Sequence, residues 1–401
     1  MRLAFIAHSF PYPAEKDGHT LILYHLLKEL SQRHKISLFC FGDKNDRINL
    51  KCLTELGISV RIIERPKRSL FLYYLSKNSR KMAWFQYRLF TNEMVKEVET
   101  IDNCPDFDLV CVHSPFVSAY LQYFKHKPVV FTYIDALSSW YQQFASVTAN
   151  PLKKVHYLFE GHKASHLERE LSKKMFDTIV VSEIDKKIIS CLSPEAPISV
   201  IPNGVDLDYY RPSLTPPDPN VIIFTGTMDY PPNARAVLDF YNEVWPLLIK
   251  ERPELRWLIV GKNPTLDVFE LQSKDENIKV TGYVKDIRPC LWRSAVYVSP
   301  LSLGTGFKNK IIEAMACGKA IVASPTSLSG LTAEHGKHLL IANTPQEYRE
   351  HIIALLAKPE RRQKLEIAAR KLAELFSWSQ TARQYEEVFT RVLSRHHDSK
   401  K

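Results

Sequence analysis

The residues best suited to chemistry lie between Pro300 and Pro325, in a stretch that combines glycines, lysines and one carboxylate. It reads PLSLGTGFKNKIIEAMACGKAIVASP. Gly304 and Gly306 predict a tight turn before a helix, whose first backbone N–H groups have no partner within the helix. The helix dipole adds partial positive charge there, and Lys308 and Lys310 add two full charges. This combination predicts a site for a diphosphate.

Glu313 is the carboxylate of this stretch, about one and a half turns into the expected helix. A carboxylate repels a phosphate, but it accepts hydrogen bonds from vicinal hydroxyls, as acidic residues do at the ribose of nucleotide sites. We therefore expect a nucleotide ligand. The same pattern also fits a tight turn before a core helix that binds nothing.

Two apolar segments must position these residues. Ala295 to Ser299 (AVYVS) and Ala320 to Ala323 (AIVA) both read as buried strands. Between them lies a helix of about ten residues that ends at Gly318, a suitable C-terminal cap. Strand, glycine turn, helix and strand form the parallel unit of an α/β sheet, with the ligand end at the turn.

The segment GTGFKNKIIEAMACGKAIVAS resembles the nucleotide-sugar motif of glycosyltransferase family 4. In that motif an acidic residue, seven intervening residues and a Glu-Ala-Met-Ala helix bind the donor. The second glutamate, which holds the ribose, corresponds to Glu313, whereas Thr305 stands at the position of the first. A subgroup associated with exosortase and exopolysaccharide systems shares this variant, with a Gly-x-Gly and a Lys-Asn-Lys run. The resemblance spans nearly the whole chain.

The resemblance also implies positions for the rest of the donor site. Family members usually carry an arginine after the glycine that corresponds to Gly226, but Thr227 stands there, and no basic residue follows before Arg235. The phosphate charge must then be met by Lys262 together with the two lysines of the glycine turn. The residues expected to bind the donor are Gly18, Gly226, Thr227, Lys262, Tyr283, Val284, Gly304, Thr305, Gly306, Phe307, Asn309 and Glu313.

In the first half of the chain, two loops follow predicted strands. Gly18 lies in the first loop, which in the resembled family faces the donor phosphates and the acceptor. Asp135 follows the strand Val129 to Tyr133, where the family often has a histidine that contacts the donor sugar. We assign catalytic roles to Asp135, Lys308 and Lys310.

Composition sets broad limits on function. The 401 residues are 45% hydrophobic and 24% charged, which is ordinary for a globular protein, and the net charge is +10. This basic balance admits nucleic acid, an anionic membrane or phosphorylated substrates. The 7 scattered cysteines form no Cys-x-x-Cys pair, which argues against a disulfide or zinc framework. We expect no metal and no other cofactor, and we assign the Asp-x-Asp at Asp206 and Asp208 to an interdomain turn.

Alternating strands and helices predict two doubly wound parallel sheets, the α/β class. The resemblance implies the GT-B fold, in which two Rossmann-like domains face a cleft and a C-terminal helix crosses back to the first domain. We expect an acceptor-side domain over 1–200 with a returning helix at 376–395, a linker at 201–220, and a nucleotide-sugar domain over 221–375. Helices are expected from about Thr20 to Arg33 and from Asn233, as its cap, to Lys250.

Residues 66–91 are basic and aromatic without any acidic residue. Such a segment suits contact with anionic lipid headgroups, although a partly buried helix pair or an RNA-binding surface would show the same composition. The short apolar run at the N-terminus predicts a strand rather than a signal peptide. We therefore expect a cytoplasmic protein on the inner face of the plasma membrane, with no nucleic-acid partner.

The resemblance implies a retaining glycosyltransferase that moves a sugar from a nucleotide-sugar donor to a lipid-linked or polysaccharide acceptor, in the synthesis of cell-surface polysaccharide. Two alternatives stay open. A nucleotide-sugar epimerase of the same fold would convert its donor without an acceptor. A catalytically silent nucleotide-sugar-binding scaffold would explain the loss of the usual first glutamate and of the arginine.

Overall fold

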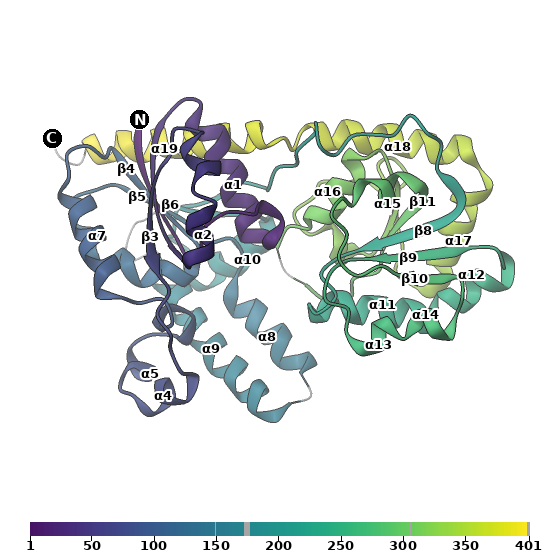
Figure 1. The fold of residues 1–401 in the computed structure, drawn as a ribbon, viewed down its shortest axis with the longest axis horizontal. Helices are drawn as coiled ribbons and strands as arrows, with labels where there is room; N and C mark the ends of the chain where they lie inside the picture. Colours follow the sequence, from purple (N-terminus) through teal and green to yellow (C-terminus); the bar gives the residue numbers. More distant parts are fainter. Residues whose placement is uncertain (149, 172–176, 305, 399–401) are drawn as a thin grey trace. The chain divides into compact units, whose positions relative to one another are not determined.

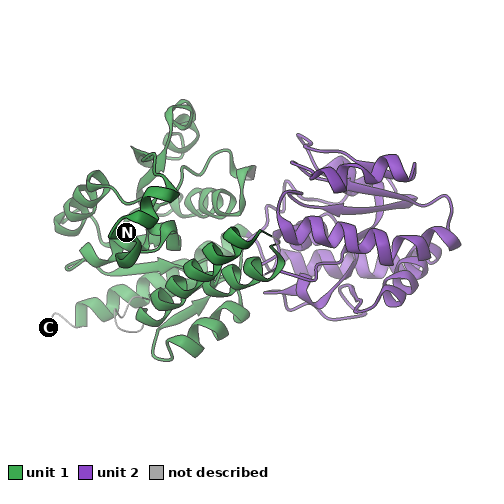
Figure 2. Ribbon diagram, turned by 90° about the horizontal axis from the view of Figure 1, so that it is seen from below, with its two compact units in different colours: residues 1–203, 378–401 green, residues 204–377 purple. Residues whose placement is uncertain are grey.

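The computed structural model describes residues 1–148, 150–171, 177–304 and 306–398. The chain divides into two compact units (Figure 2). Unit 1 comprises Met1–Asn203 and the C-terminal segment from Trp378, and unit 2 comprises Gly204–Ser377. Among the described residues, no helix combines the length and the apolar character needed to cross a bilayer.

Unit 1, whose strands β3, β4, β5 and β6 are labelled in Figure 1, is built on a sheet in which every described strand pairs in parallel. The strand order is β3-β2-β1-β4-β5-β6-β7. The strands are β1 Arg2–Ala7, β2 Lys35–Gly42, β3 Ser59–Glu64, β4 Leu109–His113, β5 Val129–Thr132, β6 Asp177–Val180 and β7 Ile198–Val200. The strand order reverses between β1 and β4. Ligands bind at such a switch point in doubly wound sheets, beyond the carboxyl ends of the strands.

All the named helices of unit 1 except the last, α19, connect these strands. The helices are α1 Gly18–Ser31, α2 Lys44–Ile48, α3 Lys51–Thr54, α4 Leu70–Leu75, α5 Asn78–Lys81, α6 Trp84–Tyr87, α7 Asn92–Asn103, α8 Leu137–Val147, α9 Pro151–Glu170, α10 Glu183–Leu192 and α19 Trp378–Asp398. The first of them begins two residues earlier than predicted. The Asp17 carboxylate accepts a hydrogen bond from Thr20 N at 2.9 Å, and the Thr20 hydroxyl accepts one from Asp17 N at 3.0 Å. This reciprocal cap starts α1 at Gly18.

The last helix, α19, completes the core of unit 1. Its residues Tyr385, Val388 and Phe389 are buried in one apolar cluster with Phe5 of β1. The rings of Phe5 and Phe389 lie 6.5 Å apart, edge to face. The apolar face of α19 therefore packs on the first sheet, although the whole of unit 2 lies between β7 and α19 in the sequence.

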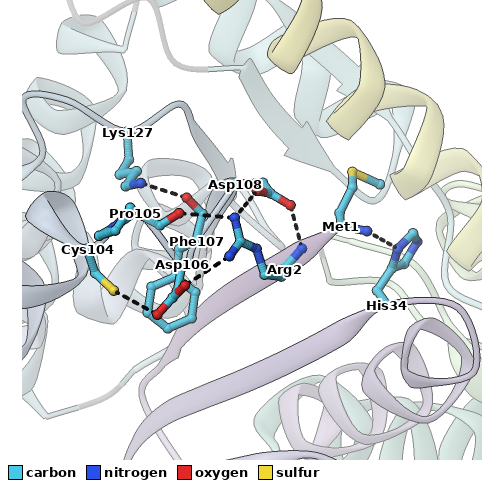
Figure 3. A network of polar contacts seen from close by, with 9 residues as sticks. All are labelled: Met1, Arg2, His34, Cys104, Pro105, Asp106, Phe107, Asp108 and Lys127. Carbon is cyan, nitrogen blue, oxygen red and sulfur yellow. Dashed lines mark hydrogen bonds and ion pairs between the residues drawn. The ribbon is translucent and has the colours of Figure 1, made fainter.

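A polar network fixes the amino end of β1 (Figure 3). The Arg2 guanidinium donates to the carboxylates of Asp106 and Asp108, at 3.0 and 3.2 Å, and Arg2 N donates to Asp108 at 2.7 Å. Lys127 Nζ donates to the Phe107 carbonyl at 2.6 Å. These bonds connect β1 to the loop before β4. They lie at the amino ends of the strands, on the edge of the sheet opposite the switch point.

Unit 2 repeats the same topology, with parallel strands in the order β10-β9-β8-β11-β12-β13. The strands are β8 Asp218–Thr225, β9 Arg256–Val260, β10 Ile278–Val280, β11 Ser294–Ser299, β12 Ala320–Ala323 and β13 Leu340–Ile341. Its switch point lies between β8 and β11. The two sheets confirm the predicted α/β class.

The helices of unit 2 include α11 Pro231–Glu243, α12 Trp245–Glu251, α13 Leu266–Phe269, α14 Leu271–Lys274, α15 Arg288–Arg293, α16 Asn309–Ala316, α17 Pro345–Ala357 and α18 Pro359–Glu374. The single helix predicted from Asn233 to Lys250 was wrong, because the structure breaks it at Val244. Pro246 has no N–H to continue the helical hydrogen bonds. Two prolines at the first positions of α11 also start it before Asn233.

Candidate functional site

The candidate site lies in unit 2, where the loops after β8 and β11 leave the sheet at its switch point. The first loop begins with Gly226, and the second runs through Gly304 and Gly306 into α16. The parallel register places Ile223 of β8 beside Tyr297 of β11. These two loops occupy the position that holds the ligand in doubly wound folds.

Backbone hydrogen bonds join the loop after β8 to the end of β9 and to the loop that follows it. Gly226 N donates to Val260 O at 3.0 Å, and Met228 N donates to Lys262 O at 2.8 Å. A Cβ on Gly261 would lie only 1.7 Å from Gly226 O. Gly261 is therefore required so that the loop after β8 can approach the loop after β9.

Replacing Gly261 with alanine is expected to lower the free energy of unfolding by about 3 kcal/mol or more, because backbone rather than a flexible side chain must give way. Urea denaturation followed by circular dichroism measures the loss. Gly18→Ala is the matched control, since its Cβ would meet no atom within 4 Å. Equal midpoints for the two variants would contradict the close approach seen here.

Lys310 reaches from the first turn of α16 to the first turn of α11, the helix that follows the loop after β8. Its Nζ donates to Asn233 Oδ1 at 2.7 Å and lies 4.3 Å from the centre of the Phe224 ring. Asn233 Nδ2 donates in turn to Thr227 O at 2.9 Å. Asn233 is therefore not the cap of its helix, as predicted, but the residue that links Lys310 to Thr227.

The glycine turn before α16 has the geometry that its residues predict. Gly304 and Gly306 have φ values of 133° and 71°, which favour glycine. Lys308 occupies the N-cap position of α16, and its Nζ donates to Gly306 O at 3.2 Å. Thr305 lies outside the described residues. Phe307 is buried, with its ring 6.0 Å from that of Phe376.

Glu313 lies one turn further along α16 and shares an electrostatic environment with Lys310. Burial, together with the charge of Lys308, lowers the pKa of Lys310 to about 7. Burial raises the pKa of Glu313 to about 7 against the opposing effects of a Tyr210 hydrogen bond and the Lys310 charge. Both side chains are partly exposed. An anion bound here would favour the charged form of Lys310.

The partner of Glu313 is the hydroxyl of Tyr210, which donates to the carboxylate. Tyr210 belongs to the segment 201–220, which is predicted from its prolines to be a linker. Arg370 of α18 holds that segment on unit 2, where its Nη1 donates to Tyr210 O at 2.8 Å and to Ala316 O at 2.7 Å. Sequence reasoning missed this contact because only an unremarkable Tyr-Tyr pair before Arg-Pro marks it.

The Asp-x-Asp of the same segment forms a turn. The Asp206 carboxylate accepts hydrogen bonds from Asp208 N at 3.1 Å and Tyr209 N at 2.9 Å. Tyr209 lies under the guanidinium of Arg288, whose Cζ is 4.0 Å from the ring centre. Both tyrosines of the segment are therefore packed on unit 2.

The remaining predicted donor residues follow β9 and β10. Lys262 is partly exposed after β9, and its carbonyl pairs with the loop after β8. Tyr283 is 74% exposed and Val284 is partly exposed, both after β10. They lie at the carboxyl ends of neighbouring strands, on the same edge of the sheet as the glycine turn.

Unit 1 contains the other two predicted residues. Gly18 is exposed at the first position of α1. Asp135 is partly exposed after β5, and the next residue, Ala136, donates from its N to Asp185 Oδ1 at 2.9 Å. Both lie in loops at the carboxyl edge of the first sheet.

A histidine cluster at the switch point of unit 1 was not predicted from the sequence. His8 follows β1, His113 ends β4, and His19 lies in the first turn of α1. Ring centres are 3.7 Å apart for His8 and His19, and 5.1 Å apart for His19 and His113. Both ring nitrogens of His113 are buried and make no hydrogen bond within the described part of the chain. No sequence spacing brings these three residues together.

The cluster predicts that acid destabilises unit 1. Burial lowers the pKa of all three histidines, and that of His19 falls to about 3. The charge of His19 lowers the pKa of His8 and His113 further, and the charge of Arg65 lowers that of His8 and His19. Unfolded histidines bind protons near pH 6.5. The unfolded state therefore gains protons first as the pH falls, so stability is complete above pH 6.5 and decreases below it.

His113→Leu should reduce this pH dependence. Between pH 6.5 and 5.0, one buried neutral histidine accounts for about 2 kcal/mol of lost stability. Urea midpoints at the two pH values measure the difference, and His126→Leu serves as an exposed control. If both variants lose as much stability as the parent, the buried cluster is not responsible.

Family models match most of the chain. Residues 17–209 match the model described as "Glycosyltransferase Family 4", and residues 219–358 match the one described as "Glycosyl transferases group 1". A phosphatidyl-myo-inositol mannosyltransferase of Mycobacterium tuberculosis is 27% identical over 241 residues, covering 56% of this chain and 62% of that protein. The chain thus spans about three fifths of the length of that relative.

Two solved structures have the same fold. HepE of Anabaena, in complex with UDP and glucose, aligns with a TM-score of 0.65 at 16% identity, covering 97% of this chain and 99% of that one. Sucrose-phosphate synthase of Thermosynechococcus elongatus aligns with a TM-score of 0.71 at 16% identity, covering 98% and 100%. Each consists of the same two-domain α/β architecture along its whole length.

Proposed function

The chain belongs to glycosyltransferase family 4, and on this basis we propose that it is a retaining glycosyltransferase. It transfers a sugar from a nucleotide-sugar donor, bound by unit 2, to a lipid-linked or polysaccharide acceptor, bound by unit 1. Its place is the synthesis of cell-surface polysaccharide on the inner face of the plasma membrane. Residues 66–91 provide its peripheral contact with that membrane.

The observation that carries this proposal is the meeting of Lys310, the N-terminus of α16 and Glu313 at the switch point of the second sheet. Lysine and helix N–H groups favour a diphosphate, and a carboxylate one turn away favours a diol. A nucleoside diphosphate offers both groups at this spacing. Neither a bare phosphate nor a free sugar would use all three features.

In the proposed reaction, the bond between the sugar carbon and the phosphate oxygen breaks while the acceptor oxygen bonds to the same carbon from the same face. The departing phosphate takes the proton of the acceptor hydroxyl. Negative charge grows on the leaving oxygen, and preorganised cations there lower the barrier. Lys310 and Lys308 supply these cations, and the bound diphosphate keeps Lys310 protonated near neutral pH.

Support for the acceptor and donor classes comes from the similar proteins. The relative from Mycobacterium tuberculosis is named for transfer of mannose to phosphatidyl-myo-inositol, a lipid acceptor. The Anabaena structure holds UDP and glucose. A lipid-linked acceptor and a nucleotide-sugar donor are the corresponding partners proposed for this chain.

A nucleotide-sugar-binding scaffold is the second candidate. Thr227 and Thr305 stand where the family motif has an arginine and a glutamate, and both changes remove a charged group from the donor site. Such a protein would keep donor binding through Glu313 but would not transfer the sugar.

The test is incubation of the full chain with UDP-, GDP-, dTDP- and ADP-sugars, with and without extracted bacterial lipid-linked acceptors. Sugar transfer that requires the acceptor supports the proposal. Conversion of the donor without acceptor identifies an epimerase, and binding alone identifies the scaffold. A thermal-shift screen selects the base first, since a ligand at 100 times its dissociation constant adds about 2.7 kcal/mol to stability.

A further inference from the structure

Helix α4 of unit 1 exposes large apolar side chains. Phe71, Leu72 and Leu75 are 72%, 63% and 71% exposed, whereas Tyr73 between them is fully buried. One face of this short helix therefore packs on the unit, and the other presents apolar residues to solvent.

The first two turns of α9 expose a second apolar row. Leu152, Val155 and Leu158 are 81%, 66% and 53% exposed. The row adjoins α4, because the Tyr74 hydroxyl lies 2.6 Å from His156 Nδ1 and the Tyr74 ring lies 5.7 Å from that of Phe159. Figure 1 shows α4 and α5 beside the lower end of α9. The two helices form one apolar surface, larger than the scattered apolar residues of an ordinary soluble surface.

Buried polar contacts hold α4 in this position. Glu160 of α9 is fully buried, and its carboxylate accepts from Trp84 N at 2.7 Å and from the Tyr73 hydroxyl at 3.4 Å. Lys163, one turn along, donates from Nζ to the Tyr73 hydroxyl at 2.8 Å and to Met82 O at 2.7 Å. The exposed apolar residues thus project from a packed helix pair and not from a loose loop.

The two segments that form this surface carry exposed charge of a single sign. No acidic residue occurs in 66–91 or in 150–159. The exposed basic residues of these two segments are Lys67, Arg68, Lys77, Arg80, Lys81, Arg88, Lys153 and Lys154. A second copy of the same surface would be repelled, whereas an anionic bilayer offers hydrocarbon for the apolar rows and phosphate headgroups for the lysines.

We propose that α4 and the first two turns of α9 together form a docking surface for an anionic phospholipid bilayer. Phe71, Leu75, Leu152 and Val155 enter the boundary between headgroups and acyl chains, and the lysines lie at the headgroups. The surface extends the membrane contact of the proposed function, on which it rests for its biological purpose, from residues 66–91 to α9. The binding itself requires no sugar transfer.

The experiment is sedimentation of the full chain with two kinds of vesicle, pure phosphatidylcholine and phosphatidylcholine with about one third phosphatidylglycerol. We expect the protein to sediment with the anionic vesicles at low salt and to be released by 0.5 M salt. The added salt shortens the Debye length roughly three-fold, which weakens the attraction between the lysines and the lipid headgroups. Absence of binding to the anionic vesicles, or equal binding to both kinds, overturns the proposal. If the protein does not bind the anionic vesicles, an acidic protein becomes the expected partner of the surface.

Variants separate the two helices. Phe71→Ser and Leu152→Ser should each weaken partition into anionic vesicles at least fivefold, and the double variant more than tenfold. Leu266→Ser and Leu375→Ser remove leucines of similar exposure, 71% and 70%, from unit 2 and should have no effect. If Leu152→Ser binds like the parent, α9 is not part of the surface.

Thermal shift with the donor selected for the parent protein, measured on the same samples, shows whether each variant is folded. Vesicle binding without sugar transfer supports the docking surface and contradicts the proposed transferase function. Transfer to a detergent-solubilised acceptor without vesicle binding contradicts the docking surface and supports the transferase function.

Discussion

Lys310→Ala should reduce kcat/KM for sugar transfer about a hundredfold to a thousandfold, since loss of one preorganised donor at the leaving group costs about 2.7–4 kcal/mol. Lys310 is expected to matter this much because its Nζ, bonded to Asn233 and lying over Phe224, connects α16 with α11 and β8 at the switch point. Lys308→Ala should also lower turnover, but less, because Lys308 Nζ donates to Gly306 O, a carbonyl of its own turn, and so lies within the second loop.

The pH dependence of kcat/KM tests the role of Lys310 independently. With a pKa of about 7 in the free protein, Lys310 loses its charge as the pH rises through neutrality, so kcat/KM should fall above pH 7. Lys310→Arg keeps its charge throughout and should remove this decline, even if its absolute rate is lower.

Steady-state rates from pH 6 to 9 check both statements. The control is Lys337→Ala, which removes an exposed lysine paired only with Glu334 in the described structure. The position of the active site is wrong if Lys310→Ala transfers sugar as fast as this control.

Glu313→Gln should raise the dissociation constant of the donor about tenfold to a hundredfold, because hydrogen bonds to a charged acceptor contribute about 1.5–3 kcal/mol. Burial raises the pKa of Glu313 to about 7, so the carboxylate protonates and donor affinity falls as the pH decreases below 7. Calorimetric titration at pH 8 and pH 6 measures both effects.

Tyr210→Phe is expected to change donor affinity in the opposite direction. The Tyr210 hydroxyl occupies the carboxylate that the ribose would use. Its removal should tighten donor binding about tenfold at pH 8. The reason is that the ribose then no longer has to displace a hydrogen bond to a charged carboxylate, which contributes about 1.5–3 kcal/mol. Tyr209→Phe is the matched control, since its hydroxyl donates to Asp286 at 3.2 Å.

The ribose contact itself is tested with a nucleoside diphosphate and its 2′-deoxy analogue. The parent protein should prefer the ribonucleotide, and Glu313→Gln should lose most of that preference. An unchanged preference in the variant would show that Glu313 does not contact the ribose.

The order of elements and the ligand edge follow from the sequence alone. Apolar runs of strand length alternate with amphipathic segments, and this local periodicity sets parallel, doubly wound sheets whatever the details of packing. The glycine turn before α16 is likewise local, since Gly304 and Gly306 adopt positive φ values within a few residues of Lys308. These features depend on neighbours in the chain, which the sequence displays.

Only the tertiary structure shows which side chains meet across distant elements. Lys310 bonds to Asn233, 77 residues away, and Glu313 bonds to a tyrosine in a segment whose prolines suggested only a linker. His8 and His113 become neighbours through the pairing of β1 with β4, and α4 lies on α9 through the buried Glu160. Such contacts are set by the register of strands and the packing of whole helices, which no local spacing of residue types encodes.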